Sequence, residues 1–398
     1  MRGNQRASGD PAATRPPVGL ATVVREWGRI GCIGFGGPPA HIALLRKLCV
    51  QDRKWLDPQE FEDAIAACNL LPGPASTQLA IFCAWRVRGR AGALAGGAAF
   101  IVPGLIVILA LAVLFLRGDP PTWVKAAGAG AGAAVAAVAV QAGVSLIPAG
   151  WSRAPQHSSR VRWTLYLLAG TVAAAMIGPW LVLLLIACGI VEVVAQRVPA
   201  APRRGPLPGL PILAGAGLGG GVLLSIAWAA IKVGALSYGG GFVIVPLMRA
   251  DAVDHHHWMT GEQFLNAVAL GQITPGPVVQ TVAVVGYAAA GIGGGLLAAA
   301  VAFSPSFAFI LLGAHRFDRL RGNLAVRAFL DGAGPAAIGA ILGSAIPLVR
   351  ILTQPWQYCV LAVAAVLMLA LRRGPVLTLL AAAAAGVVIV LAGGALPH

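Results

Sequence analysis

Two Pro-Gly-Pro triplets, at residues 72–74 and 275–277, interrupt apolar sequence and mark the places where this chain could do chemistry. A glycine between two prolines breaks a helix. The broken ends leave free backbone N–H groups and the positive end of a helix dipole, which together attract anions. The predicted binding residues at these breaks are Asn69, Pro72, Gly73, Pro74, Thr77, Gln78, Gln272, Pro275, Gly276, Pro277 and Gln280. The alternative role of the polar side chains is to cap the broken helix ends.

Two glycine-rich segments form a second pair of breaks. They are Gly36-Gly37-Pro38 and Gly239-Gly240-Gly241, and we predict that they bind the same anion. Glycine lets the backbone approach a ligand closely. Broken backbone at membrane depth is tolerated only where protein or a water-filled cavity satisfies its polar groups. The alternative explanation for the glycine runs is tight helix packing through small residues.

One cation precedes each glycine-rich segment. Arg29 and Lys232 are 203 positions apart, and the same shift superposes the glycines that follow them, Gly31 and Gly234. Charges inside a membrane are unfavourable and are usually functional, so a cation at equivalent depth in two places suits a doubly negative substrate. Arg29 stands at the start of its apolar segment, and an interfacial role is the alternative for it.

The surrounding sequence has the composition of a membrane protein. It is 58% apolar and 11% charged with a mean hydropathy of +0.80, whereas soluble domains are roughly 45–50% apolar and about 25% charged. Many apolar stretches approach the ~20 residues that span a bilayer, and about ten crossings are expected. The net charge of +15 lies in clusters between these stretches, as the positive-inside rule predicts, and does not indicate nucleic-acid binding.

The chain repeats itself. A shift of 203 positions aligns the glycine-rich segments, Trp55 with Trp258, and the Pro-Gly-Pro triplets, with Thr77 and Gln78 falling on Gln280 and Thr281; after about residue 100 the shift becomes 202. We therefore expect residues 1–19 to be a disordered cytoplasmic tail, residues 20–198 and 212–398 to be two copies of one unit, and residues 199–211 to be a Pro-rich linker.

Aligned loops of the two copies carry different charges. Residues 46–54 hold four basic and one acidic side chain, whereas aligned residues 249–257 hold one arginine and two aspartates. Residues 86–90 hold three arginines and their counterparts none, while the next loop reverses the pattern, with the excess of positive charge in residues 319–327. Opposite charges at aligned loops predict an inverted-topology repeat, an arrangement typical of secondary transporters with a site near the midplane.

The basic segments 46–54 and 86–90 are separated by only one apolar stretch. If both lie on the cytoplasmic side, that stretch must turn back, and its central Pro-Gly-Pro triplet is the natural turning point. We therefore expect re-entrant hairpins, with a kinked crossing as the alternative. The arginines of the second basic segment, Arg86, Arg88 and Arg90, are predicted to line a cytoplasmic vestibule.

Two paired motifs resemble those of the chromate ion transporter family in its long, two-domain form. They are Phe35-Gly36-Gly37-Pro38 with Trp55 and residues 71–74, and Ser237 to Gly241 with Trp258-Met259 and residues 274–277. The similarity runs through both halves. It implies a bacterial inner-membrane protein that exports chromate from the cytoplasm, thereby giving chromate resistance, with sulfate as the chemically similar oxyanion.

The sequence thus predicts an all-α polytopic membrane protein that works as a secondary transporter and not as an enzyme. The expected partners are the oxyanion and membrane lipid, and a homodimer remains open. A sulfate or other oxyanion permease and an anion channel are the alternatives, because selectivity built from backbone breaks serves both carriers and channels. No sequence motif calls for a cofactor, and the six cysteines stand singly, which favours neither a disulfide framework nor a metal site.

Overall fold

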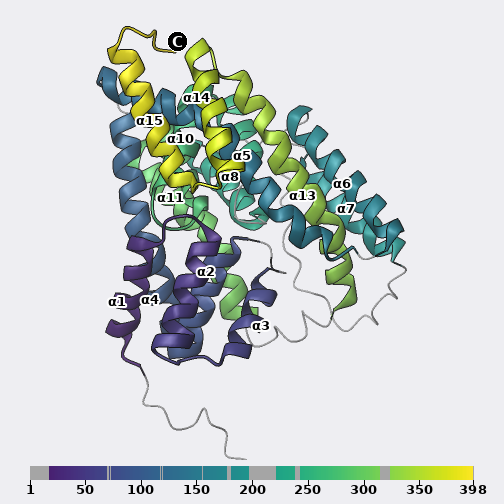
Figure 1. The fold of residues 1–398 in the computed structure, drawn as a ribbon. Coiled ribbons are helices and arrows are strands. Elements are labelled where there is room, and N and C mark those ends of the chain that lie inside the picture. The colour runs from purple at the N-terminus through teal and green to yellow at the C-terminus, as the bar shows by residue number, and fades with distance from the viewer. Residues whose placement is uncertain are drawn as a thin grey trace, which may run out of the picture.

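The computed structural model describes residues 18–397 except 70, 72, 117, 119, 155, 177–180, 197–220, 238–242 and 314–322. These described residues form helices and connecting loops without any strand (Figure 1), which confirms the predicted all-α fold for this part of the chain. The expected tail, apart from its last two residues, and the expected linker lie outside it. Four of the described helices are long and apolar enough to cross a membrane, namely Ala75–Leu116, Thr122–Trp151, Val278–Gly313 and Leu324–Arg350.

Two helical hairpins form the first part of the fold. The first hairpin joins α1 to α2 and η2, and the second joins α3 to the beginning of α4; their bounds are Leu20–Ile33, Pro38–Arg46, Lys47–Asp52, Pro58–Cys68 and Ala75–Leu116. At the open end of the first hairpin Arg53 donates to Glu26 over 2.6 Å. At the open end of the second, Arg86 forms an ion pair with Glu60. The glycine-rich loop and the Pro-Gly-Pro loop are therefore the closed tips.

Helix α4 reverses its direction at Arg88 and Gly89. Their backbone angles are not helical, and Gly89 has a φ of +60°. Residues 75–87 and residues 90–116 consequently lie antiparallel, so closely that a methyl group on Gly92 would come within 2.3 Å of the Ala84 carbonyl oxygen. The second arm, residues 90–116, is the part of α4 that is long enough to span hydrocarbon at 1.5 Å per residue.

The second half repeats these hairpins with α8, α9, η4, α10, η5 and α11. Their bounds are Val222–Leu236, Ile244–Arg249, Ala250–His255, Gly261–Ile273, Val278–Gln280 and Thr281–Gly313. Helix α11 folds back at Ala290 and Gly291, with φ values of −150° and +64° against −144° and +60° at the corresponding point of α4. This reversal lies 202 positions after that of α4, so the shift has already changed well before residue 100, where the sequence comparison placed it.

The long second arms of α4 and α11 pack against each other in opposite directions. Gly97 lies against Phe307, and further along α4 Leu109 lies against Gly295, nearer the start of the α11 arm. The same two arms contact their own hairpins near Gly92 and Gly294. The open ends of the two hairpin pairs therefore lie near opposite ends of this helix pair.

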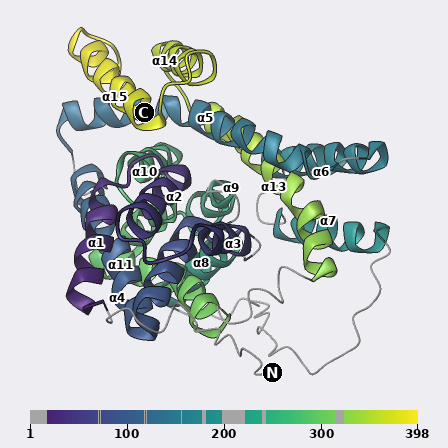
Figure 2. The same ribbon diagram turned by 60° about the horizontal axis from the view of Figure 1, so that its bottom comes forward.

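The remaining helices exchange partners between the halves. They are α5 (Thr122–Trp151), α6 (His157–Met176), α7 (Leu181–Ala195), α13 (Leu324–Arg350), α14 (Pro355–Ala365), η7 (Val366–Ala370) and α15 (Pro375–Leu391). Helix α5 of the first half packs on α14 and α15, whereas α13 of the second half packs on α6 and α7. Figure 2 shows α5 and α13 running beside the hairpin bundle, with α14 and α15 above it and α6 and α7 farther along.

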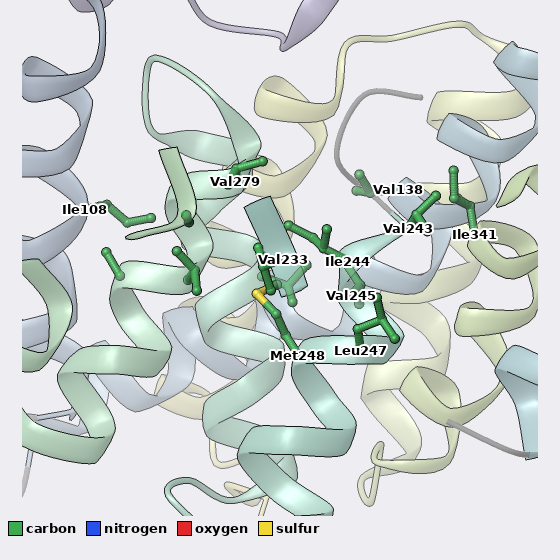
Figure 3. Packing of buried hydrophobic residues seen from close by; sticks show 14 of the residues in the cluster. Ile108, Val138, Val233, Val243, Ile244, Val245, Leu247, Met248, Val279 and Ile341 are labelled. Carbon is green, nitrogen blue, oxygen red and sulfur yellow. The ribbon is translucent and has the colours of Figure 1, made fainter. Parts of the chain in front are cut away.

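A continuous apolar core joins the two halves. In Figure 3, Val233 of α8 and Met248 of α9 lie at its centre, with Ile108 of α4 on one side and Val138 and Ile341 of α5 and α13 on the other. Large apolar side chains are also exposed along the outer faces of α6, α7 and α15. Exposed apolar surface of this extent is expected where helices face lipid.

Candidate functional site

The first Pro-Gly-Pro loop is buried between the two halves. Pro72 lies outside the described residues, but Gly73 and Pro74 are buried, and Gly73 has a φ of +115° that favours glycine. A methyl group on Gly73 would lie 2.7 Å from Gln78 Nε2 and 3.2 Å from the carbonyl oxygen of Gly234 in the second half. Ser306 Oγ of α11 would be 3.5 Å away. The loop therefore sits against the second half of the chain.

The second Pro-Gly-Pro loop sits in the same way against the first half. The N–H of Gly276 donates to the carbonyl oxygen of Gly34 over 2.9 Å, and Gln280 Nε2 donates to the carbonyl oxygen of Ile101 over 2.8 Å. A methyl group on Gly104 would come within 2.1 Å of the Pro275 carbonyl oxygen. Each loop is thus held by the other half.

The two glutamines occupy equivalent places. Gln78 approaches Gly73, and Gln280 Nε2 would be 3.2 Å from a methyl group on Gly276. Gln280 is therefore the counterpart of Gln78. The sequence comparison, which aligned Gln280 with Thr77, was wrong by one position here. The reason is that the one-residue deletion falls directly after the Pro-Gly-Pro triplet, where Ala75-Ser76-Thr77 stands against Val278-Val279 and the two segments share no register signal.

The glycine-rich loop of the first half joins the same place. Gly36 and Gly37 have φ values of +97° and +73°, and Gly37 precedes Pro38 at the start of α2. A methyl group on Gly37 would touch Val278, just after the second Pro-Gly-Pro loop. The counterparts predicted in the second half, Gly239, Gly240 and Gly241, lie outside the described residues.

His41 is a residue of this site that the sequence comparison did not single out. Its side chain is fully buried. Nε2 lies 2.9 Å from the carbonyl oxygen of Gly34, and Nδ1 lies 3.2 Å from Ser76 Oγ. Because a carbonyl can only accept, Nε2 carries the hydrogen and Nδ1 accepts from the serine hydroxyl. His41 therefore ties the tip of the first hairpin to that of the second, and its position four residues after Gly37 was the available signal.

Several buried polar atoms at these tips have no hydrogen-bond partner. They are Thr77 Oγ1, Ser237 Oγ, Gln272 Nε2, Gln280 Oε1 and Ser306 Oγ. Buried polar groups are normally paired, and an orphan group needs an explanation. Four of these five atoms can themselves donate a hydrogen bond, and Gln280 Oε1 can only accept one. We define the tip cluster as the following buried residues, which stand at the chain breaks or against them: Gly34, His41, Gly73, Ser76, Thr77, Gln78, Gly104, Gly234, Ser237, Gln272, Pro275, Gly276, Gln280 and Ser306.

The two predicted cations lie in the walls of the hairpins. Lys232 stands one helical turn before the end of α8, and its ammonium group is 2.8 and 2.7 Å from the two carboxylate oxygens of Asp251. Its charge is thus neutralised within the second half. Arg29 is exposed and lines a cavity of about 380 Å³ together with Lys47 and Arg53.

The predicted vestibule residues lie at the open end of the first half. Arg86, Arg88 and Arg90 are exposed and surround the reversal of α4. Asn69 is exposed at the end of α3, where it occupies the C-cap position. None of these four side chains belongs to the tip cluster. Within the described residues no group of three or more His, Cys, Asp or Glu could hold a metal ion.

A second polar cluster lies farther out, between α6 and α7 of the first half. Glu192 of α7 is 3% exposed and accepts from Arg162 over 2.8 and 2.9 Å, from Tyr166 over 3.0 Å and from Gln196 over 3.0 Å. Tyr166, Glu192 and Gln196 also line a cavity of about 30 Å³ together with Asp331 of α13. The carboxylate of Glu192 is fully satisfied, so we interpret this cluster as a structural contact between α6 and α7.

Apolar spanning helices that enclose buried donors at their breaks define an integral membrane transporter. Two regions of the chain, residues 21–193 and 224–387, match the family model described as chromate transporter. The chain therefore belongs to the chromate transporter family.

Curated relatives carry matching names. The chain is 32% identical to the chromate transport protein of Cupriavidus metallidurans over 85% of this chain and 84% of that protein. It is 28% identical to the chromate transport protein of Pseudomonas aeruginosa, over 86% and 84% of the two chains. The probable chromate transport protein of Synechococcus elongatus is 27% identical over 84% and 86%. No solved structure matches the chain.

Proposed function

We propose that this protein exports chromate across the bacterial inner membrane and thereby confers resistance to it. The observation that carries the proposal is the set of unpartnered buried donors in the tip cluster. An oxyanion offers acceptors in several directions, and hydroxyl and amide donors held in a low-dielectric site bind it more strongly than they would in water. The names of the relatives point to chromate as that oxyanion.

The proposed binding residues are those that the sequence predicted at the breaks. They comprise Gly36, Gly37, Pro38, Gly73, Pro74, Thr77, Gln78, Gln272, Pro275, Gly276, Pro277 and Gln280, together with Pro72, Gly239, Gly240 and Gly241 beyond the described residues. Ser237 and Ser306 join them as donors. Arg29 contributes through its positive field at the hairpin wall. Lys232, whose charge is balanced by Asp251, contributes by holding α8 in place beside the second tip.

The proposed architecture is a pair of inverted-topology repeats, residues 20–198 and 212–398, with about ten crossings and re-entrant hairpins whose tips meet in mid-membrane. The antiparallel packing of the second arms of α4 and α11 supports the inversion. The reciprocal seating of each Pro-Gly-Pro loop in the other half supports a shared site near the pseudo-twofold axis. Helix α1 is about 21 Å long at 1.5 Å per residue, which is more than half of a ~30 Å hydrocarbon layer. A re-entrant hairpin of this length is long enough for its tip to reach the middle of the membrane.

The proposed path enters from the open end of the first half. The basic residues there, including Arg86, Arg88 and Arg90, raise the local concentration of anions at the cytoplasmic mouth. The anion then reaches the tip cluster between the hairpins. It leaves after the two halves rock against each other, as inverted-repeat carriers do.

Inside-out membrane vesicles test the direction and the cargo. Vesicles that contain this protein are expected to accumulate more radiolabelled chromate than protein-free vesicles do. Excess sulfate is expected to reduce this accumulation by competition. Accumulation only in right-side-out vesicles would contradict export, and uptake of sulfate without chromate would identify a sulfate permease. Trans-stimulation of chromate efflux by chromate on the opposite side marks a carrier, whereas its absence together with unsaturable flux marks a channel.

A further inference from the structure

The tip cluster contains one ionisable side chain among its described residues, and it is His41. A doubly charged anion in hydrocarbon has a very unfavourable solvation energy unless charge of the opposite sign accompanies it. Lys232, the cation closest along the chain to the second-half tip, is neutralised by Asp251. The proton is therefore the positive charge that the described part of this site can add.

The neutral imidazole has a hydrogen-bond arrangement that protonation would reverse. In the structure Nε2–H donates to Gly34, and Nδ1 accepts from the Ser76 hydroxyl. A proton added at Nδ1 makes that nitrogen a donor, so Ser76 Oγ must accept from it. The serine hydroxyl hydrogen is then released and can turn toward an acceptor in the tip cluster. Protonation of one ring thus creates both a positive charge and a new donor.

The groups that touch the His41 ring are uncharged. They are the Gly34 carbonyl, the Ser76 hydroxyl and the edge-packed ring of Phe100, whose centre is 5.0 Å away. The ionisable groups on the elements packed against α2 are Arg25, Glu26, Arg29, Cys32, Lys47, Cys49, Asp52, Cys83, Arg86, Arg88 and Arg90. Glu26 is held by Arg53, and Arg86 by Glu60, at the open ends of the hairpins. The anion is therefore the charge to which the His41 proton would respond.

We propose that His41 takes up a proton from solvent at Nδ1 when the oxyanion binds, so that one proton and one dianion occupy the tip cluster together. This inference rests on the proposed function. Because linkage is reciprocal, anion binding favours protonation as much as protonation favours anion binding. The net charge in the occupied site is then minus one instead of minus two.

Calorimetric titration of the purified full-length protein with potassium chromate at pH 8, in buffers of different ionisation enthalpy, tests this. The expected result is uptake of about one proton for each chromate bound by the wild-type protein, with affinity falling about tenfold for each unit of rising pH in this range. His41→Gln keeps a side-chain N–H that can donate to Gly34 but cannot titrate; we expect chromate binding that is weaker, independent of pH and without proton uptake. His157→Gln, at an exposed histidine that starts α6, is the matched control and should behave like the wild type.

The outcomes separate the inference from the function on which it rests. Chromate binding without proton uptake in the wild type overturns the inference and leaves the proposed function intact, even if His41→Gln fails to fold. Equal proton uptake in His41→Gln also overturns it, because the proton then resides on the anion or elsewhere. No chromate binding by the wild type at any pH overturns the proposed function and the inference together. Ser76→Ala should retain the proton uptake and bind chromate several-fold more weakly.

Discussion

The two hairpin pairs share a backbone but differ in side chains. Both contain a π-helical turn at the same relative position, η2 and η4, and both fold back at a pair of residues with nearly equal dihedral angles. Even the positive φ of Lys54, +50°, recurs as +52° at His257. The charges do not recur, since arginine stands at the reversal of α4 and alanine at that of α11. The repeat therefore preserves the breaks and not the charges.

This difference separates the residues that shape the site, glycine and proline, from the charged and ionisable residues that act on the substrate or orient each half. Glycine and proline at the breaks are needed in both halves because each tip must enter the other half. Charges orient each half in the membrane, and they should differ if the halves are oppositely oriented. The ionisable residue of the tip cluster also lies in one half only, with His41 of the first half replaced by Ile244 at the aligned position.

The largest effect is expected where one half has no room for the side chain that the other carries. Gly104 corresponds to Ser306 at a shift of 202, and a methyl group on Gly104 would lie 2.1 Å from the Pro275 carbonyl oxygen. Gly104→Ala should displace the second tip and reduce chromate transport by about tenfold or more, given an overpacking penalty of about 1–3 kcal/mol. Gly293→Ala, where the methyl group meets open space, is the control. Full transport by Gly104→Ala in vesicles would show that the tip does not need this close fit.

The next largest effect concerns an ion pair that only the second half has. Lys232→Met leaves Asp251 largely buried without its partner and should lower the free energy of unfolding by roughly 2–3 kcal/mol, measured by thermal melting in detergent. The double variant Lys232→Met with Asp251→Leu should recover most of the stability and also the transport. A stable double variant that cannot transport would instead make Lys232 a substrate ligand. Arg53, which pairs with Glu26, is more exposed than Lys232. Its replacement by alanine should therefore lower the free energy of unfolding by about 1 kcal/mol or less.

A comparable loss of stability is expected at the tie between α7 and α6. Arg162→Ala leaves the buried Glu192 carboxylate without its cation, and we expect a loss on the order of 2–3 kcal/mol with little change in chromate affinity. The aligned residues of the second half, at a shift of 202, are Ala364 and Gly394, which cannot form this pair. A melting temperature equal to that of the wild type would show that the Arg162–Glu192 pair does not stabilise the fold.

The smallest and most evenly matched effect concerns the two reversals. Gly89 and Gly291 have φ values of +60° and +64°, and a methyl group would meet nothing within 4 Å at either residue. Their ψ values of −152° and −156° put both in a region that essentially only glycine adopts. Alanine at each position should therefore cost roughly 1–3 kcal/mol through backbone strain alone, equally in both halves and additively in the double variant. Unequal decreases in melting temperature would show that the two reversals contribute differently to the stability of the protein.

Local chemistry explains which features could be predicted. Proline and glycine mark helix breaks locally, so the breaks at Gly36-Gly37 and at the Pro-Gly-Pro triplets could be predicted from short segments. The hairpin of α3 and α4 could be predicted from the charges of the loops on either side. The contacts between halves did not, because no local signal pairs Gly34 with Gly276 or Ile101 with Gln280. Asp251, the partner of Lys232, was missed because its aligned residue is Leu48, so the repeat offers no matching pair.

We propose that the two hairpin pairs enter the membrane from opposite sides and meet at their tips. Lys54→Cys and His257→Cys place thiols at equivalent points beside the two open ends, and a background without native cysteines isolates their reactivity. In intact cells, a membrane-impermeant maleimide should label the cysteine at 257 from outside, whereas the cysteine at 54 should react only after the inner membrane is opened. Labelling of both cysteines from the same face of the membrane would contradict the account.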